Sequence, residues 1–206
     1  MPNDLRGRVL LSVALAAGAG CVLLILGRAG AERRYRFMKS LAEKDSLTLL
    51  YNHGAFHERL LVEIERAVRY ERDLSVIMVD LDGFKSINDT FGHLVGDDVL
   101  LLTGAILGAH LRKSDIASRY GGDEFALLLP ETGFEAAGAI AGRISEGIAG
   151  ASVRGQKGEF VRFTASVGYA SCRSGSERRG DILGEADRLM FESKRHEKGG
   201  VRGMQI

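Results

Sequence analysis

The sequence predicts a mixed α/β (α+β) fold, in which helices pack against a central sheet. One observation is a long apolar run at residues 75–79, which is typical of a buried central strand. A second is a predicted β-hairpin over residues 116–129, with Gly121 and Gly122 at its tip. A third is that these strands alternate with helical segments, which favours a sheet of mixed direction covered by helices.

The first element is an uncharged apolar segment at residues 9–27, which is long enough to cross a bilayer. It separates a short tail, 1–8, from a basic segment, 28–44. A buried helix and a cleaved signal peptide are the alternatives, because Ala29-Gly30-Ala31 looks like a small-residue cleavage site. More basic residues follow the segment than precede it, so we expect a single-pass anchor with its C-terminal side in the cytoplasm.

The basic segment is predicted to continue from the anchor as a helix. Tyr35, Met38 and Ala42 fall at coiled-coil-like spacing, so two such helices could pair in parallel. The alternative is a basic helix that lies near anionic lipid, and the two interpretations are compatible.

Residues 45–206 are numerous enough to bury a sizeable core and form the predicted globular domain. This domain is mildly acidic, whereas residues 1–44 are basic, which argues against nucleic acid as its partner. The two cysteines, Cys21 and Cys172, offer no disulfide framework and no zinc spacing. Hydrophobic periodicity and turn residues predict helices at 54–72, 83–91, 96–111, 135–148 and 182–196, and strands at 74–80, 116–119, 125–129 and 160–171.

Acidic residues gather where two predicted strands end. Asp80 and Asp82 close the apolar run, and Asp123 and Glu124 follow the two glycines. Carboxylates at the end of a buried strand are costly unless they bind something, and Mg²⁺ takes a few carboxylates. We therefore expect Asp80 and Asp123 to converge on one cation from adjacent strands, with the glycines supplying turn angles and a bare backbone. A solvated acidic edge is the alternative.

These motifs together resemble the GGDEF domain of bacterial diguanylate cyclases. The core of the resemblance is Gly121-Gly122-Asp123-Glu124-Phe125, with Asp80-Leu81-Asp82-Gly83-Phe84-Lys85 and Asn88-Asp89 upstream. Further matches, in the family's order, are Asp45-Ser46-Leu47-Thr48, Phe91-Gly92-His93, Gly96-Asp97, Ala186-Asp187 and Lys194. The resemblance implies a palm-like, ferredoxin-related sheet with antiparallel strands at its centre. It also implies a homodimer at the bacterial inner membrane that joins two GTP into cyclic di-GMP and releases two pyrophosphates.

The resemblance further implies a role for each matching residue at the metal. Asp80, Asp123 and the backbone carbonyl of Leu81 would ligate Mg²⁺ (or Mn²⁺). Glu124 would either bind the metal or accept the hydroxyl proton. Asp82 would support the ligands, or would cap the helix that begins near Gly83.

The substrate residues follow from the same resemblance. Phe84 and Lys85 would meet the phosphates at a helix start, beside the bare backbone of Gly121 and Gly122. The remaining substrate-binding residues would be Lys194 and Lys198 for the phosphates and Asn88 and Asp97 for guanine. Taken alone, an exposed helix lysine and an Asn-Asp turn are the ordinary explanations of Lys85 and Asn88.

Arg112 and Asp115 match the spacing of the family's inhibitory product site. The alternative is a helix-terminal arginine followed by a turn into the next strand. Departures from the family pattern are Ser46 in place of proline, His53-Gly54 in place of a basic pair, and Lys198 in place of arginine. Because lysine cannot bind phosphate bidentately, we expect weaker GTP binding there.

Three other functions compete with an active cyclase. A non-catalytic sensor of GTP or cyclic di-GMP is disfavoured because Asp80, Asp123 and Glu124 are all present. A membrane interaction module with a partner-recruiting basic linker is not required by any feature. Another palm-fold cyclase or polymerase is disfavoured by Asp97, which would select guanine.

Overall fold

The computed structural model describes residues 43–173, 175–176, 180–196 and 198–206. The predicted anchor at 9–27 and nearly all of the basic segment at 28–44 lie outside these residues. Within the described part of the chain, no helix has the length and apolar character needed to span a membrane.

The described elements alternate between strands and helices, as predicted. In chain order they are β1 (Tyr51–Asn52), α2 (His53–Arg69), β2 (Leu74–Leu81), α3 (Phe84–Phe91), α4 (His93–His110), β3 (Ile116–Arg119), β4 (Glu124–Pro130), α5 (Phe134–Ala149), β5 (Ser152–Arg154), β6 (Phe160–Arg162), β7 (Ala165–Cys172), α6 (Ile182–His196) and β8 (Val201–Gln205). The predicted helices and the 116–129 hairpin are confirmed within a few residues at each end.

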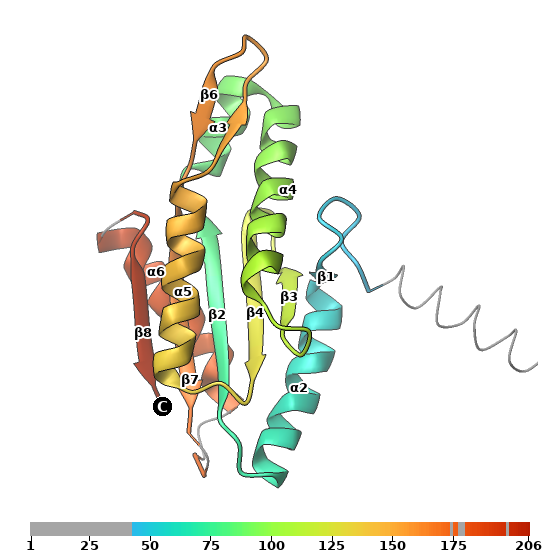
Figure 1. The fold of residues 1–206 in the computed structure, drawn as a ribbon, viewed down its shortest axis with the longest axis vertical. Helices are drawn as coiled ribbons and strands as arrows, with labels where there is room; N and C mark the ends of the chain where they lie inside the picture. Colours follow the sequence, from blue (N-terminus) through green and yellow to red (C-terminus); the bar gives the residue numbers. More distant parts are fainter. Residues whose placement is uncertain (1–42, 174, 177–179, 197) are drawn as a thin grey trace, which may run out of the picture. The chain divides into compact units, whose positions relative to one another are not determined.

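A six-stranded sheet of order β1-β3-β4-β2-β7-β8 forms the centre of the domain (Figure 1). Strand β2 lies between β4 and β7 and is antiparallel to both, whereas β1 with β3 and β7 with β8 pair in parallel. This confirms the mixed α/β sheet with antiparallel strands at its centre.

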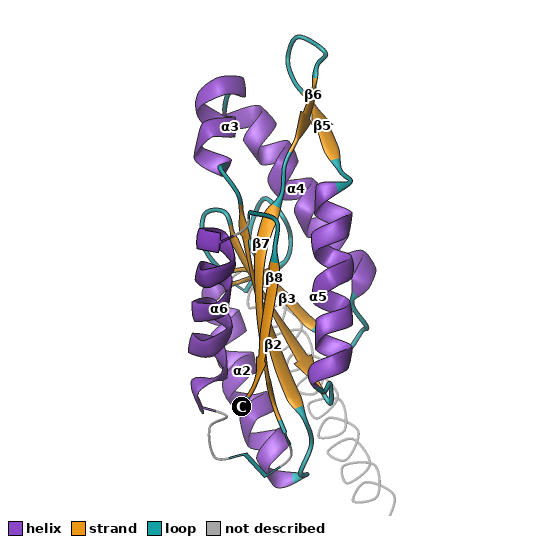
Figure 2. Ribbon diagram, turned by 90° about the vertical axis from the view of Figure 1, so that its left-hand side faces the viewer, coloured by secondary structure: helices purple, strands orange, loops and turns teal. Residues whose placement is uncertain are grey.

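Helices cover both faces of the sheet, with α2 and α6 on one side and α4 and α5 on the other (Figure 2). Strand β2 is buried along its whole length, and its side chains alternate between the two cores. Ile77, Val79 and Leu81 join the α4–α5 core, whereas Val76 and Met78 join the α2–α6 core. This alternation predicts that Asp80 faces α2 and α6.

Helix α6 lies directly against strand β7 at Gly168. A Cβ atom added there would stand 2.1 Å from the backbone nitrogen of Met190 and 2.3 Å from the carbonyl oxygen of Ala186. Only glycine allows this approach of two backbones. The position of α6 over the sheet is therefore set by the missing side chain.

The predicted single strand at 160–171 is wrong. Residues 160–162 form β6, which pairs with β5 in a separate two-stranded sheet, and β7 then joins the main sheet beside β2. The chain changes partners between the two strands, at Phe163 and Thr164. Strands β1, β5 and β8 were not predicted, because β1 and β5 are very short and β8 is exposed along its length.

Candidate active site

The C-terminal end of β2 places the carboxylates of two residues opposite each other. Asp80 pairs with Glu124 across the β2–β4 ladder, and Asp80 is only 6% exposed. The backbone N–H of Leu81 donates to the carbonyl of Asp123 at 3.2 Å. Asp80 and Glu124 therefore form a non-hydrogen-bonded pair, in which cross-strand side chains come closest.

Asp123 does not belong to the strand. It lies in the turn immediately before β4, and its carbonyl caps the ladder at Leu81. Glu124, and not Asp123, therefore stands opposite Asp80 in the ladder, and Asp123 approaches from the turn. The Asp123 carboxylate is nevertheless near enough to help raise the pKa values of Asp80 and Glu124.

Lys194, from α6, reaches the same carboxylates. Its Nζ donates to Asp80 Oδ1 at 2.6 Å. Burial alone would lower the pKa of Lys194, but the hydrogen bond and charge of Asp80 raise it. Burial raises the pKa of Asp80, and Asp123 and Asp82 add to this, so that together they outweigh the opposite effect of Lys194.

Glu124 also has a raised pKa. Burial is the main cause, and the negative charges of Asp80, Asp187 and Asp123 add to it, while Lys194 acts in the opposite direction. Three acids and one lysine thus surround this carboxyl group. Such crowding leaves the site short of positive charge.

Asp82 holds three segments together and does not cap α3. Its Oδ2 accepts hydrogen bonds from Thr164 Oγ1 at 2.7 Å and from the Gly199 N–H at 2.8 Å. Its Oδ1 accepts from Ser166 Oγ at 2.7 Å. Gly83 occupies the cap position of α3, without a side-chain hydrogen bond to the helix. The capping alternative is therefore wrong, and Asp82 joins the end of β2 to β7 and to the turn after α6.

The two glycines of the hairpin tip do not supply left-handed backbone angles, in contrast to our expectation. Neither Gly121 nor Gly122 is among the glycines of positive φ. A Cβ at Gly121 would stand 2.6 Å from Glu124 Oε2, whereas no atom of the described residues lies within 4 Å of a Cβ at Gly122. Gly121 thus leaves room for Glu124, and Gly122 leaves an open approach to the backbone.

A metal can be tested against these residues. Among the residues described, no three His, Cys, Asp or Glu side chains are gathered closely enough to hold an ion unaided. Mg²⁺ needs only a few carboxylates, since it retains water and takes oxygens from a bound phosphate. In an extended strand the carbonyl of Leu81 points the same way as its N–H, toward Asp123. The carboxylates of Asp80, Asp123 and Glu124 with this carbonyl fit such an open site.

A second group of predicted residues lies on α3 and α4. A Cβ added at Gly96 would stand 1.9 Å from Asn88 Oδ1 and 3.3 Å from Phe84 Cζ. Asn88 and Phe84 therefore pack on the α4 backbone next to Asp97. Lys85, beside them, is exposed.

The predicted inhibitory pair lies in a turn between α4 and β3. The backbone N–H of Arg112 donates to Asp115 Oδ2 at 2.8 Å, and Ser114 Oγ donates to Asp115 Oδ1 at 3.2 Å. The turn expected as the alternative is therefore present. Arg112 is exposed, so its guanidinium is accessible to a ligand. Lys198 is likewise exposed, one residue before Gly199.

The segment before β1 is tied to the hairpin tip through Arg119. This arginine donates to the carbonyl of Gly122 through Nη2 at 2.8 Å and to Asp45 Oδ2 through Nη1 at 3.3 Å. Asp45 also accepts hydrogen bonds from the backbone and hydroxyl of Thr48. Although burial opposes it, these Thr48 bonds and the charge of Arg119 lower the pKa of Asp45.

An open pocket of about 350 Å³ adjoins the acids between α6 and the hairpin. Its lining residues are Met78, Tyr120, Glu124, Leu183, Gly184 and Asp187. Sequence reasoning named Asp187 in a matching motif without a role and assigned no function to Tyr120. Asp187 and Lys194 are seven residues apart on α6, and this spacing could have placed both on one face.

Comparison with known proteins identifies relatives of this domain. The family model "Diguanylate cyclase, GGDEF domain" matches residues 42–200. The diguanylate cyclase DgcP of Pseudomonas aeruginosa is 39% identical over 151 residues, 73% of this chain and 22% of the relative. Diguanylate cyclase A of Treponema denticola is 36% identical over 154 residues, 75% of this chain and 39% of the relative. The chain thus spans well under half of the length of either relative.

Solved structures show the same fold. The GGDEF domain of DgcB from Caulobacter crescentus, in complex with c-di-GMP, is 27% identical with a TM-score of 0.74, covering 79% of this chain and 93% of that one. The GGDEF domain of TpbB (YfiN) from Pseudomonas aeruginosa is 35% identical with a TM-score of 0.72, covering 78% and 93%.

Proposed function

This chain belongs to the GGDEF family of diguanylate cyclases, and from this membership we propose that it condenses two GTP molecules into cyclic di-GMP. In each half-reaction a 3′-oxygen forms a bond to the α-phosphorus of the other nucleotide, and the bond to pyrophosphate breaks. The observation that carries the proposal is the cluster of Asp80, Glu124 and Lys194 at the buried end of β2.

A bound Mg²⁺ or Mn²⁺ would supply positive charge for the phosphate oxygens. Asp80, Asp123, Glu124 and the Leu81 carbonyl are the groups that would hold it. With a cation bound at Asp80, the Lys194 ammonium would turn from that carboxylate to a phosphate oxygen. It would then supply a second positive charge to the phosphates. Lys85 and Lys198, both exposed, bind the outer phosphates.

Glu124 also accepts the proton of the attacking 3′-hydroxyl. A general base works best when its pKa lies near the working pH. In the metal-free domain, burial and the neighbouring acids raise the pKa of Glu124 toward that range, and a bound cation would lower it again. Gly122 leaves the backbone open where the phosphates approach.

Guanine binds between α3 and α4. The carboxylate of Asp97 accepts hydrogen bonds from guanine N1 and N2, and the amide of Asn88, supported by the bare backbone of Gly96, forms further hydrogen bonds at the base edge. Adenine would leave the Asp97 carboxylate unpaired, so the pocket selects GTP. Phe84 packs beside Asn88 and completes one wall.

Three further parts belong to the proposal. Because each domain holds one GTP, the product forms between two domains of a homodimer. Cyclic di-GMP inhibits by binding Arg112 and Asp115, and the exposure of Arg112 supports this. Residues 9–27 anchor the chain in the inner membrane, with the cyclase domain in the cytoplasm.

The experiment is to incubate the full chain, in detergent micelles, with GTP and Mg²⁺ and to detect cyclic di-GMP by mass spectrometry. Asp123→Ala serves as the inactive counterpart. Product from the native chain and none from the variant supports the proposal. A folded, dimeric, GTP-binding sample without product would instead indicate a non-catalytic sensor.

A further inference from the structure

Two histidines stand one helical turn apart at the start of α2. His53 and His57 are related as i and i+4, which places their side chains on one face of the helix. Their ring centroids lie 4.5 Å apart. Paired imidazoles at this spacing on a helix form a common chelating arrangement for Zn²⁺.

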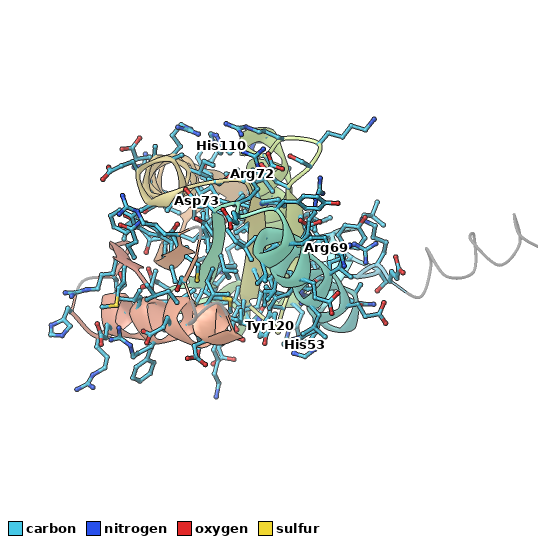
Figure 3. All side chains as sticks on the ribbon, turned by 90° about the horizontal axis from the view of Figure 1, so that it is seen from below. His53, Arg69, Arg72, Asp73, His110 and Tyr120 are labelled. Atoms are coloured by element: carbon cyan, nitrogen blue, oxygen red, sulfur yellow. The ribbon has the colours of Figure 1, made fainter. Side chains whose placement is uncertain are left out.

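Tyr120 brings a third donor to the same place from a distant part of the sequence. Its hydroxyl lies 3.0 Å from His57 Nε2, at hydrogen-bonding distance. Its ring centroid is 4.5 Å from that of His53, and the two side chains lie side by side in Figure 3. Two imidazole rings and one phenol ring therefore come together at the edge of the domain.

This cluster is joined to the catalytic turn. The backbone N–H groups of Tyr120 and Gly121 both donate to the carbonyl of Glu124, at 2.8 and 3.1 Å. Tyr120 also lines the open pocket, together with Glu124 and Asp187. A displacement of Tyr120 would therefore be transmitted to Glu124.

The chemistry of the cluster suits a transition metal better than Mg²⁺. Imidazole nitrogens favour Zn²⁺, Cu²⁺ and Ni²⁺, whereas Mg²⁺ prefers oxygen ligands. Burial and the neighbouring His53 lower the pKa of His57, which favours the neutral ring that binds a metal, whereas burial and the charges of Asp187 and Glu124 raise the pKa of Tyr120. The carboxylates of Glu124 and Asp187, across the pocket, favour a cation on this side.

We propose that His53, His57 and Tyr120 form a binding site for Zn²⁺, and that bound zinc inhibits the enzyme. Zinc replaces the hydrogen bond between His57 and Tyr120 with bonds to both groups. The phenol proton passes to solvent, and water completes the coordination. The binding part stands on the geometry alone, whereas the inhibition rests on the proposed function.

Binding is tested on the full chain in saturating Mg²⁺ and without GTP, by competition with a chromophoric zinc chelator. His53→Gln and His57→Gln each remove one of two linked ligands, so we expect affinity to fall by roughly 10²-fold. The matched control is His110→Gln, which changes a histidine on the opposite side of the domain (Figure 3). It should bind zinc like the native chain.

A Co²⁺-loaded sample adds a spectroscopic readout. The visible absorption of bound cobalt should change in Tyr120→Phe, because one oxygen donor is lost, and should stay unchanged in His110→Gln. His53 is exposed, so His53→Gln tests the site without disturbing the core. Native-like zinc affinity in His53→Gln and His57→Gln would overturn the site, whether or not the chain makes product.

Inhibition is tested by initial rates of cyclic di-GMP formation with and without added zinc at fixed Mg²⁺. We expect zinc to slow the native chain and His110→Gln, and to leave the His53→Gln, His57→Gln double variant unaffected. Equal inhibition of the double variant would overturn the regulatory role, since zinc would then act elsewhere.

Discussion

The end of β2 and the α3–α4 pair hold their functional residues in different ways. Asp80 and Asp82 are bonded to α6, β7 and the turn after α6, through Lys194, Thr164, Ser166 and Gly199. Asn88, on α3, depends on one close approach to the α4 backbone at Gly96. In Figure 1 helix α3 lies beyond the end of the sheet. The sheet thus fixes the groups proposed to hold the metal, whereas two packed helices fix the groups proposed to read the base.

The largest effect is expected from Asp80→Asn, which tests the residues at the end of β2. This change removes a proposed metal ligand at the buried end of β2, so we expect cyclic di-GMP formation to fall by at least about 10³-fold, equivalent to several kcal/mol. The measurement is product by mass spectrometry at saturating GTP. Asp89→Asn, an exposed acid on α3, is the control. Activity within tenfold of native would contradict the metal-ligand role of Asp80.

Asp82→Asn tests whether the residues at the end of β2 depend on the hydrogen bonds that Asp82 accepts. The neutral amide accepts at one side-chain atom only, so the bonds from Thr164 and Gly199 lose their charge assistance, and the bond with Ser166 persists only if the serine hydroxyl turns to accept from the amide NH2 group. Loss of such supporting contacts typically costs 10- to 100-fold, and we expect roughly that loss in kcat. Steady-state kinetics over a Mg²⁺ series would measure it.

Asp98→Asn, an exposed acid on α4, is the matched control for Asp82→Asn. A higher Mg²⁺ requirement in Asp82→Asn, but not in the control, would show that the hydrogen bonds of Asp82 position the proposed metal ligands at the end of β2. If Asp82→Asn and its control behaved alike, Asp82 would have no positioning role.

Gly96→Ala tests the residues held between α3 and α4. The new methyl group would collide with Asn88, so the side chain must leave its place. We expect KM for GTP to rise by roughly tenfold, about 1.4 kcal/mol, with a smaller change in kcat. Gly108→Ala is the control on the same helix, because its added Cβ has no neighbour within 4 Å in the described part of the chain. An unchanged KM in Gly96→Ala would refute the placement of guanine at Asn88.

The smallest effect concerns stability. Because the folded-state pKa of Glu124 is raised, the ligand-free fold loses stability as pH rises above the ordinary glutamate pKa of 4.5. Removal of one of two facing carboxylates should therefore make Glu124→Gln more stable at neutral pH, by up to about 1 kcal/mol. The gain should vanish below the ordinary pKa. Denaturant unfolding of the metal-free chain at both pH values measures it, and equal stability at neutral pH would contradict the crowding of charges.

The sequence was sufficient to locate the acids but not to orient them. The apolar run before Asp80 predicted a buried strand, and Gly121-Gly122 marked the hairpin tip correctly. The predicted strand began at residue 125, whereas β4 begins at Glu124. Side chains alternate along a strand, so one residue of register decides that Glu124, and not Asp123, faces Asp80.

Other features depend on contacts that no local pattern encodes. Asp82 looked like a helix cap, but its partners are more than eighty positions away in the sequence. The contact between His57 and Tyr120 spans 63 positions. The glycines at the tip were expected to provide unusual backbone angles, and the structure shows that they provide space. Spacing along one chain segment cannot reveal such long-range partners.

The contact of α6 with β7 at Gly168 has a consequence for mutational scanning. A methyl group at this position would push α6 away from the sheet and carry Lys194 away from Asp80. A saturation scan that scores cyclic di-GMP formation would therefore rank Gly168 beside the proposed catalytic acids, although this position faces the α6 backbone. Sensitivity to substitution at Gly168 would then reflect the distance between α6 and the sheet. Measuring residual GTP binding would distinguish this effect from the loss of a catalytic group.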